Sequence, residues 1–220
     1  MDYELLTHTM LFHGAGQEEL SAMLQCLDGR TRSFSKGTYI LRAGETADSV
    51  GMVLSGSVTI ENDDVWGNRS VLGHIGPGEI FAETYACIPG ERLMINAIAN
   101  EDTQVLFLNV KRLLQTCPHS CSHHTAMIQN LLQISARKNL ALSRRILHTS
   151  SKSIRGRLLS YFSQQVLQTG SRQFTIPFNR QQLADYLGVD RSALSNELSK
   201  MQKEGILTYK KNQFSIHQSL

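Results

Sequence analysis

The sequence predicts an α+β chain in which a β-rich half comes first, a long helix follows, and a small helical unit with a hairpin comes last. Three observations lead to this prediction. Residues 30–110 contain short apolar runs separated by glycines, residues 117–155 contain no glycine, and residues 179–202 have the spacing of two short helices joined by a tight turn. Short, evenly spaced strands of the first kind favour a barrel or a sandwich.

Length and composition are those of an ordinary globular protein. The chain has 220 residues, of which 41% are hydrophobic and 19% are charged. No stretch approaches the roughly 20 apolar residues that a membrane span needs, and residues 1–12 carry Asp2 and Glu4 and no basic leader. Four cysteines are too few for a disulfide scaffold. We therefore expect a cytoplasmic protein with free thiols and no membrane partner.

The β-rich half begins with an expected helix over residues 18–27, in which apolar side chains recur at helical spacing. A half-buried strand pair broken at Gly56 is expected over residues 49–61, where apolar and polar residues alternate with period two. The apolar members of that alternation are Val50, Met52, Leu54, Val58 and Ile60. Further strands are expected at residues 38–42, 70–75, 93–99 and 104–110.

A long helix is expected over residues 117–149. Six positions along it step by 4, 3, 4, 3 and 4 residues, which is the a/d spacing of a coiled-coil seam. These seam positions are Ile128, Leu132, Ser135, Asn139, Leu142 and Ile146. The seam predicts pairing with a second copy of the chain, and its two polar members can fix the register. The alternative is a single helix that packs on its own domain. Residues 149–153 then form an expected hinge.

Charge is unevenly distributed along the chain. Residues 1–149 hold 12 Lys and Arg against 15 Asp and Glu, a net charge of −3, whereas residues 150–220 hold 10 against 4, a net charge of +6. A basic C-terminal unit beside an acidic body is typical of polyanion binding. A basic face that only contacts solvent is the alternative.

Residues 179–202, which read NRQQLADYLGVDRSALSNELSKMQ, have helix-turn-helix spacing. Ala184 is small where the two helices touch, Gly188 permits a positive φ, and Asp190 is placed to cap the second helix. The exposed face of that helix carries short polar and basic side chains suited to base edges and phosphates in a major groove. An expected hairpin over residues 206–217 adds a wing able to contact phosphate. The candidate DNA contacts are Arg180, Gln181, Arg191, Ser192, Ser195, Asn196, Lys200, Lys210 and Lys211. A helical hairpin that binds protein is the alternative.

Three further motifs accompany this run: residues 42–45 (RAGE), residues 55–58 (SGSV) and residues 76–83 (GPGEIFAE). Together the four motifs resemble the CRP/FNR superfamily of bacterial transcription factors. The resemblance implies a jelly-roll, cupin-like β-roll sensor over residues 1–116, a dimerisation helix over 117–149 and a winged helix-turn-helix over 150–220. It also implies a homodimer that binds a palindromic site in double-stranded DNA, with RNA polymerase as a further partner. The family commonly carries a Glu and an Arg where this chain has Ser192 and Asn196.

The same resemblance places an effector beside residues 76–83. The candidate effector contacts are Gly78, Ile80, Phe81, Glu83 and Arg92. Cyclic-nucleotide members place a Glu on the ribose hydroxyl and an Arg followed by Ser or Thr on the cyclic phosphate. Glu83 matches the first feature, but Arg92 is followed by Leu93 and Met94, and Ala82 replaces a glycine. We therefore expect a small-molecule effector other than cyclic AMP.

A second candidate sensor is the run CPHSCSHH at residues 117–124, where Cys117, Cys121 and His124 offer a soft metal two thiolates and an imidazole. The N-terminal cysteine group typical of iron–sulfur members is absent, so neither a cluster, haem nor another metal is the expected cofactor, and structural thiols are the alternative. Enzymatic activity is not expected, because the β-rich region holds only His74 toward a metal triad and no nucleophile or phosphate-loop motif occurs. A β-roll adaptor that acts through protein contacts without DNA is the remaining alternative.

Overall fold

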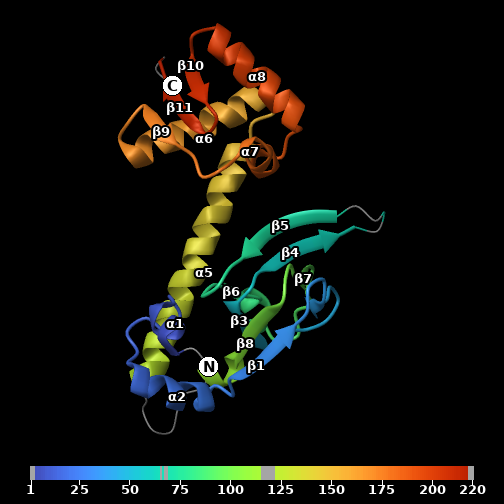
Figure 1. Cartoon of the computed structure of the whole chain (residues 1–220), viewed down its shortest axis with the longest axis vertical. Helices are drawn as coiled ribbons and strands as arrows, with labels where there is room; N and C mark the ends of the chain where they lie inside the picture. The colour runs from blue at the N-terminus through green and yellow to red at the C-terminus, as the bar shows by residue number, and fades with distance from the viewer. Residues whose placement is uncertain (1–2, 65, 67–68, 115–121, 218–220) are drawn as a thin grey trace. The chain divides into compact units, whose positions relative to one another are not determined.

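The computed structural model describes residues 3–64, 66, 69–114 and 122–217. The chain divides into two compact units, residues 1–137 and residues 138–220, and the boundary falls inside the long helix α5 (Figure 1). The expected domain boundaries at residues 116 and 149 stay a prediction. Across the described residues, none of the helices combines the length and the apolar composition that crossing a bilayer requires.

Two four-stranded antiparallel sheets form the β-roll of the N-terminal unit, as the sequence predicts. One sheet has the strand order β1-β8-β3-β6 and the other has the order β2-β7-β4-β5. The strands are β1 (Arg30–Phe34), β2 (Tyr39–Leu41), β3 (Ser49–Ser55), β4 (Val58–Asp63), β5 (Arg69–Ile75), β6 (Ile80–Phe81), β7 (Asn96–Ala99) and β8 (Thr103–Asn109). Neither β1 nor β6 was expected, because β1 reads RTRSF with one buried residue and β6 is only two residues long.

Strand β3 is buried on both faces, so the prediction of a half-buried strand is wrong for it. Val50 and Met52 belong to a hydrophobic cluster shared with the helices, whereas Val53 belongs to a second cluster between the two sheets. Val58 lies in that second cluster as well, so the predicted apolar stripe is divided between two cores. The sheet that contains β3 is therefore covered on one face by helices and on the other by the second sheet.

Helices cover the outer face of the first sheet. They are α1 (Tyr3–His8), α2 (Gln17–Cys26), α4 (Val110–Leu114) and the first turns of α5 (Ser122–Thr149), while α3 (Glu83–Ala86) follows β6. Met127, Leu131 and Ile134 of α5 pack into the cluster that Val50 and Met52 share. Asn130, on the same buried side of α5, donates its Nδ2 to the carbonyl oxygens of Leu11 at 3.0 Å and His13 at 2.9 Å. The N-terminal segment is thereby attached to α5.

The C-terminal unit contains the expected helix-turn-helix and hairpin. Its elements after α5 are α6 (Ile154–Thr169), β9 (Gln173–Thr175), α7 (Arg180–Leu187), α8 (Arg191–Lys203), β10 (Leu207–Lys210) and β11 (Gln213–Ile216). The strands form a sheet in the order β10-β11-β9, of which β9 was not expected. Phe162 of α6 is fully buried, and its ring centre lies 4.7 Å from that of Phe214 in β11. One core therefore joins α6, α7, α8 and the wing sheet.

Candidate nucleic-acid interface

Helices α7 and α8 are joined by a three-residue turn, residues 188–190, whose geometry the local sequence specifies. Gly188 ends α7 with a φ of 63°, a left-handed conformation that glycine adopts without steric cost. At the other end of α7, the Asn179 side chain accepts from the Gln182 amide and the Gln182 side chain accepts from the Asn179 amide, both at 2.9 Å. Helix α7 therefore has a defined beginning and a defined end.

Asp190 caps α8, as the sequence predicts. Its Oδ1 accepts hydrogen bonds from the amides of Ser192 at 2.8 Å and Ala193 at 2.9 Å, and from the Ser192 hydroxyl. The hydroxyl of Ser192 and then the amide of Ala193 lower the pKa of Asp190. The carboxylate thus stays ionised at the positive end of the helix dipole, which stabilises the first turn of α8.

Helix α8 buries one face and exposes the face that carries the predicted DNA contacts. The buried face is formed by Leu194, Leu198 and Met201. The exposed contacts are Arg191, Ser192, Asn196 and Lys200. Ser195 is half-buried, and its hydroxyl donates to the Arg191 carbonyl at 2.9 Å, so the Ser195 oxygen remains only as an acceptor. Asn196 and Lys200 are therefore the predicted donors in the middle of the exposed face.

Arg180 begins α7 and lies over the aromatic residues of the wing. Its guanidinium carbon is 4.9 Å from the centre of the Tyr209 ring. Burial lowers the pKa of Arg180, and within the described part of the chain its buried Nη1 has no hydrogen-bond partner. Gln181, the neighbouring predicted contact, instead donates its Nε2 to Asp185 Oδ1 at 2.8 Å within α7.

The wing is the β10–β11 hairpin, with Lys211 and Asn212 in its turn. Lys211 has a φ of 56°, in the left-handed region. Asn212 Nδ2 donates to the Ile176 carbonyl and the Ile176 amide donates to the Asn212 carbonyl, both at 3.0 Å. Asn212 therefore fixes the turn to the segment that follows β9, while the side chains of Lys210 and Lys211 are exposed at the tip.

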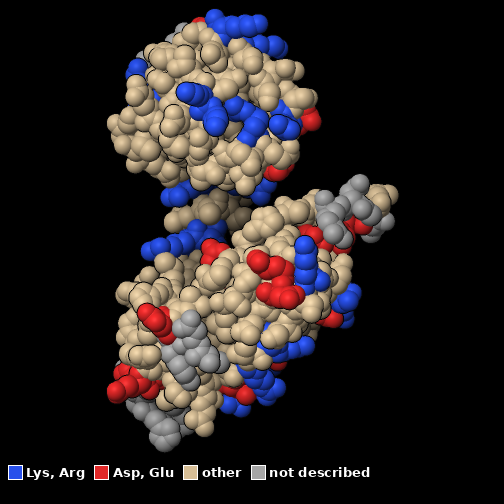
Figure 2. All heavy atoms as spheres, viewed as in Figure 1, with Lys and Arg blue, Asp and Glu red and all other residues tan. Residues whose placement is uncertain are grey.

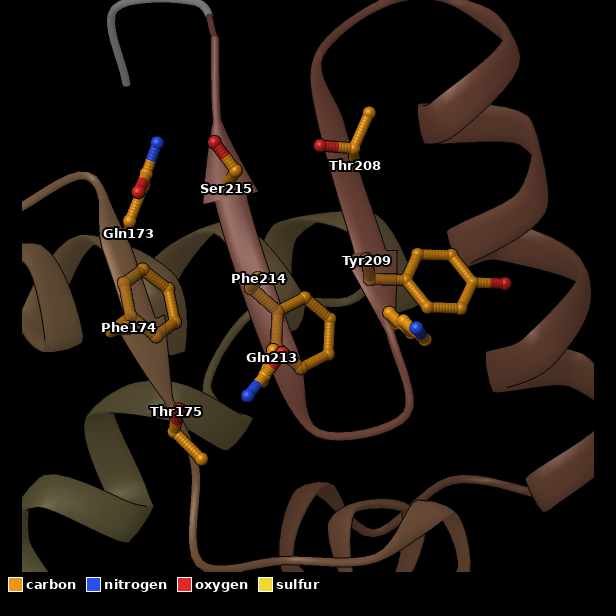
Figure 3. Close-up of a pocket in the computed structure, with 9 residues that line it drawn as sticks. Gln173, Phe174, Thr175, Thr208, Tyr209, Gln213, Phe214 and Ser215 are labelled. Atoms are coloured by element: carbon orange, nitrogen blue, oxygen red, sulfur yellow. The ribbon is translucent and has the colours of Figure 1, made fainter.

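A hollow of about 450 Å³ lies over the wing sheet (Figure 3). Gln173, Ser215 and Thr208 form a row across its three strands, and Thr175, Gln213 and Lys210 form a second row in register. Small-molecule pockets are lined mainly by apolar side chains with a few convergent polar groups. The two rows that face this hollow are polar, unlike the lining of a typical small-molecule pocket. We therefore assign no small-molecule ligand to it.

Arg155 of α6 holds α8 in place, and the sequence did not indicate this role. Its Nε lies 2.6 Å from Glu197 Oε1, and its Nη1 and Nη2 each donate to the Glu204 carboxylate at 2.8 Å. These carboxylates raise the pKa of Arg155, Glu204 more than Glu197. Exposed ion pairs contribute little to stability, so the bonds matter for orientation. Glu197 and Glu204 lie 42 and 49 residues from Arg155 along the chain, so no local pattern in the sequence indicates these contacts.

Basic side chains gather on the C-terminal unit. On the face drawn in Figure 2, this unit shows mainly Lys and Arg with few acidic groups, whereas the N-terminal unit shows both signs. The difference follows the sequence, in which residues 150–220 hold 10 basic and 4 acidic residues. The surface that carries α8 and the wing is therefore suited to a polyanion.

Two protein-family models match the chain. The model of the cyclic nucleotide-binding domain matches residues 31–120, and the model of the Crp-like helix-turn-helix domain matches residues 156–218. The chain belongs to the CRP/FNR family. This is a family of CRP-like DNA-binding transcription regulators, whose members bind DNA and function as dimers.

Known CRP/FNR proteins are similar over most of their length. The Cyclic AMP receptor protein of Thermus thermophilus is 26% identical over 200 residues, which cover 90% of this chain and 87% of that protein. The CRP-like protein Clp of Xanthomonas campestris is 27% identical over 190 residues, which cover 80% and 79%. A solved structure of CprK complexed with OCPA has the same fold, with a TM-score of 0.67 at 20% identity over 91% of this chain and 92% of that one.

Four of the candidate effector contacts of this CRP/FNR chain lie in one short segment. Gly78 has a φ of 81°, and its amide donates to the Val53 carbonyl at 2.8 Å. Ile80 and Phe81 are almost fully buried, one in the cluster beneath the helices and the other between the sheets. Glu83 is also buried, at the start of α3. Ile80 and Phe81 therefore serve the core, and Glu83 is the polar candidate of the segment.

Ala82 and Arg92 show where the effector segment departs from the cyclic-nucleotide pattern. Ala82 has a φ of 62°, so this alanine keeps the left-handed conformation that a glycine adopts freely, at a cost of roughly 1–3 kcal/mol. Arg92 Nη1 donates to the Gly44 carbonyl at 2.9 Å, and the Arg92 backbone bridges Thr46. The Arg92 guanidinium is thus engaged by the turn at residues 42–45.

The predicted seam lies on a face of α5 different from the face that packs against the N-terminal core. Leu132, Leu142 and Ile146 are 68%, 62% and 68% exposed, and Ile128 is 36% exposed. The polar seam members Ser135 and Asn139 are half-buried and exposed, respectively. A single chain therefore leaves an apolar stripe of α5 in contact with solvent.

The structure does not describe the side chains of the three predicted metal candidates. Cys117, Cys121 and the side chain of His124 lie outside the described residues. Among the residues that are described, no group of three or more His, Cys, Asp and Glu side chains is arranged to hold a metal ion. Cys87 is a free thiol whose pKa is raised by burial and, less strongly, by Glu83, so its reactive thiolate form is disfavoured.

His148 closes a buried aromatic cluster at the end of α5. It is 3% exposed, its Nδ1 lies 2.9 Å from the Tyr186 hydroxyl, and its ring meets Tyr161 edge-on at 5.3 Å. Burial is the largest effect and lowers the pKa of His148. A hydrogen bond with Gln164 opposes it, and Arg144 adds a smaller lowering. The folded unit therefore favours neutral imidazole at this position.

We predict that acid destabilises the C-terminal unit through His148. A lowered folded-state pKa means that the unfolded chain binds more protons, so stability is lost as the pH falls below about 6.5, the ordinary histidine value. Calorimetric unfolding of the full chain between pH 5 and pH 8 measures this loss. His148→Gln should flatten the dependence, and His217→Gln, at an exposed position just after β11, should leave it unchanged. An equally steep dependence in His148→Gln would contradict the assignment.

Proposed function

We propose that this protein regulates transcription as a homodimer that binds a palindromic operator, with its DNA affinity set by a small-molecule effector in the β-roll. The observation that supports this proposal best is the geometry of α8. Its apolar face is buried, its first turn is capped by Asp190, and Asn196 and Lys200 are exposed on the opposite side. A short rigid helix of this kind fits the major groove.

Asn196 is the proposed base-reading residue. Arginine binds guanine O6 and N7 bidentately, whereas asparagine prefers N6 and N7 of adenine. Because Asn196 stands where the family commonly has Arg, the half-site should differ from the usual one at the position that Arg would read. Arg191 and Ser195 supply further base contacts, while Arg180, Gln181, Lys200 and the two wing lysines position the backbone.

The exposed stripe of α5 supports pairing through the seam. An operator with two-fold symmetry requires two α8 helices related by the same symmetry. Two copies of α5 packed along the seam would bury Leu132, Leu142 and Ile146 from both chains, and Asn139 would fix the register. RNA polymerase is the expected further partner, because a regulator bound near a promoter acts by recruiting or excluding the polymerase.

The β-roll supports control by an effector, because residues 31–120 match the model of the cyclic nucleotide-binding domain. An effector changes DNA affinity only if it binds the DNA-competent arrangement of the dimer more tightly than the other arrangement. Glu83, a buried carboxyl at the start of α3, is the proposed polar contact for such a ligand. Neither Leu93 nor Met94, which follow Arg92, carries the hydroxyl of the cyclic-nucleotide pattern, and this argues against the phosphate site of cyclic AMP.

Selection from random-sequence DNA followed by gel shift tests operator binding. Asn196→Ala should weaken binding by about 1–3 kcal/mol and relax preference at one base step, while Lys211→Ala should weaken all sequences alike and reduce the salt slope by roughly one unit. Gln202→Ala, exposed on α8 outside the proposed reading face, is the control. An unchanged selected site with Asn196→Ala, or an altered base preference with Lys211→Ala, would count against the proposal.

Sedimentation of a Leu132→Asp/Leu142→Asp double variant tests the dimer. We expect monomers, because pairing would bury carboxylates without partners. Leu167→Asp provides the matched control, since Leu167 is 82% exposed on α6 and lies outside the seam. A double variant that remains dimeric would exclude this face of α5 as the interface.

Calorimetry with cyclic AMP tests the effector assignment. No micromolar binding is expected, because neither residue after Arg92 carries a hydroxyl. Micromolar binding that disappears in Arg92→Ala, but persists in Arg112→Ala on α4, would overturn this expectation. If cyclic AMP does not bind, mass spectrometry of small molecules that co-purify with the chain identifies the effector.

A further inference from the structure

The carbonyl groups at the end of α7 are held by two arginines from other helices. The last carbonyls of a helix have no partner within it. Arg145 of α5 donates its Nη2 to the Asp185 carbonyl and its Nε to the Tyr186 carbonyl, both at 3.0 Å. Arg157 of α6 donates its Nη1 to the carbonyls of Leu187 at 2.9 Å and Gly188 at 3.0 Å. Four successive carbonyls, leading into the turn before α8, thus accept hydrogen bonds from other helices, and the Asp185 carbonyl also accepts from the Gly188 amide at 3.3 Å.

The two arginines differ in what they attach to α7. Arg157 belongs to α6, inside the fold of the DNA-binding unit, and its Nε also donates to the Ser151 carbonyl at 2.9 Å. Arg145 belongs to α5, the helix that carries the proposed dimer seam. One turn further along α5, the buried ring of His148 contacts Tyr186 as well. The last turns of α5 are therefore attached to α7 by two side chains.

The geometry favours a positioning role for Arg145 over a phosphate contact. A guanidinium is a rigid planar fork, so two of its N–H groups aimed at consecutive carbonyls define a direction as well as a distance. A cation at a helix C-terminus also interacts favourably with the helix dipole. The Arg145 guanidinium carbon lies 5.7 Å from the centre of the Tyr186 ring, so the side chain is packed along α7.

We propose that Arg145 fixes the orientation of the helix-turn-helix relative to the end of α5 and thereby sets the half-site spacing that the dimer accepts. This inference rests on the proposed function, since only a dimer joined through α5 converts that orientation into a distance between two α8 helices. In two-fold symmetric regulators, operator spacing mirrors the separation of the recognition helices. Loosening Arg145 broadens the range of orientations and hence of spacings.

The test compares palindromic duplexes whose half-sites are those selected by the unmodified chain, with the central spacer changed by one or two base pairs. The unmodified protein should discriminate among spacers. Arg145→Ala should bind the original duplex roughly tenfold more weakly, a loss of about 1.4 kcal/mol, and bind the altered spacers nearly as well as the original. Arg145→Lys, which keeps the charge without the fork, should show an intermediate spacing profile.

Two controls separate positioning from other roles. Arg157→Ala disturbs the same turn from within the DNA-binding unit, so it should weaken all spacers alike and keep the profile. Arg144→Ala removes a neighbouring exposed charge and should leave the profile intact. If Arg145→Ala keeps the spacing profile, or lowers the salt slope by about one unit as a lost phosphate contact does, the inference is wrong. If Arg145→Ala fails to fold by circular dichroism, the profile of Arg145→Lys decides.

Failure of the proposed function gives a different result. In that case the unmodified chain sediments as a monomer or selects no palindromic DNA. A dimeric, DNA-binding protein whose spacing preference survives Arg145→Ala and Arg145→Lys would instead reject only the positioning role.

Discussion

The orientation of α8, and so the direction in which its polar face points, depends on two kinds of contact. The inner faces of α7 and α8 pack in one core, and hydrogen bonds hold the polar backbone groups at the ends of both helices. Leu194, Leu198 and Met201 are fully buried, which sets the rotation of α8 about its axis. Hydrophobic contact alone is non-directional, however, and permits sliding. The direction comes from polar groups: Asn179 and Asp190 at the helix beginnings, the arginine-held carbonyls at the end of α7, and Arg155 on the outside of α8. Hydrogen bonds weaken steeply when they are bent, so these bonds favour one orientation of α7 and α8.

Helix α5 carries two apolar stripes with different purposes. One, formed by Met127, Leu131 and Ile134, completes the core of the N-terminal unit. The other is the seam, whose apolar members Leu132, Leu142 and Ile146 are exposed. Each core position is followed directly by a seam position, since Ile128, Leu132 and Ser135 come one residue after Met127, Leu131 and Ile134. Successive residues of an α-helix point about 100° apart, so the two stripes lie on different faces of α5. The same helix can therefore belong to a folded sensor and to a dimer at once.

The β-roll places its candidate effector segment between two cores. Ile80 and Phe81 point into clusters on opposite sides of one sheet, so movement of this segment disturbs both. Ala82 holds a left-handed backbone conformation beside Glu83, which stores a small amount of strain where a ligand is proposed to bind. Packed cores have discrete arrangements, and this property lets a local ligand bias a larger rearrangement.

The sequence by itself determined the fold class, the helix-turn-helix with its Asp190 cap, the wing hairpin and the position of the apolar stripe along α5. These features are encoded within a few residues of each other, in caps, turn glycines and periodic spacing, so local reasoning was enough. The tertiary structure alone decided that β3 is buried on both faces, that β1, β6 and β9 complete the sheets, and that Arg145, Arg155 and Arg157 bond within the protein. In the sequence these arginines look like any other basic residue of a DNA-binding unit. Apart from Ser151, which lies close to Arg157 in the sequence, their partners lie 30 to 49 residues away. Only the folded chain brings a guanidinium within 3.0 Å of these particular oxygens.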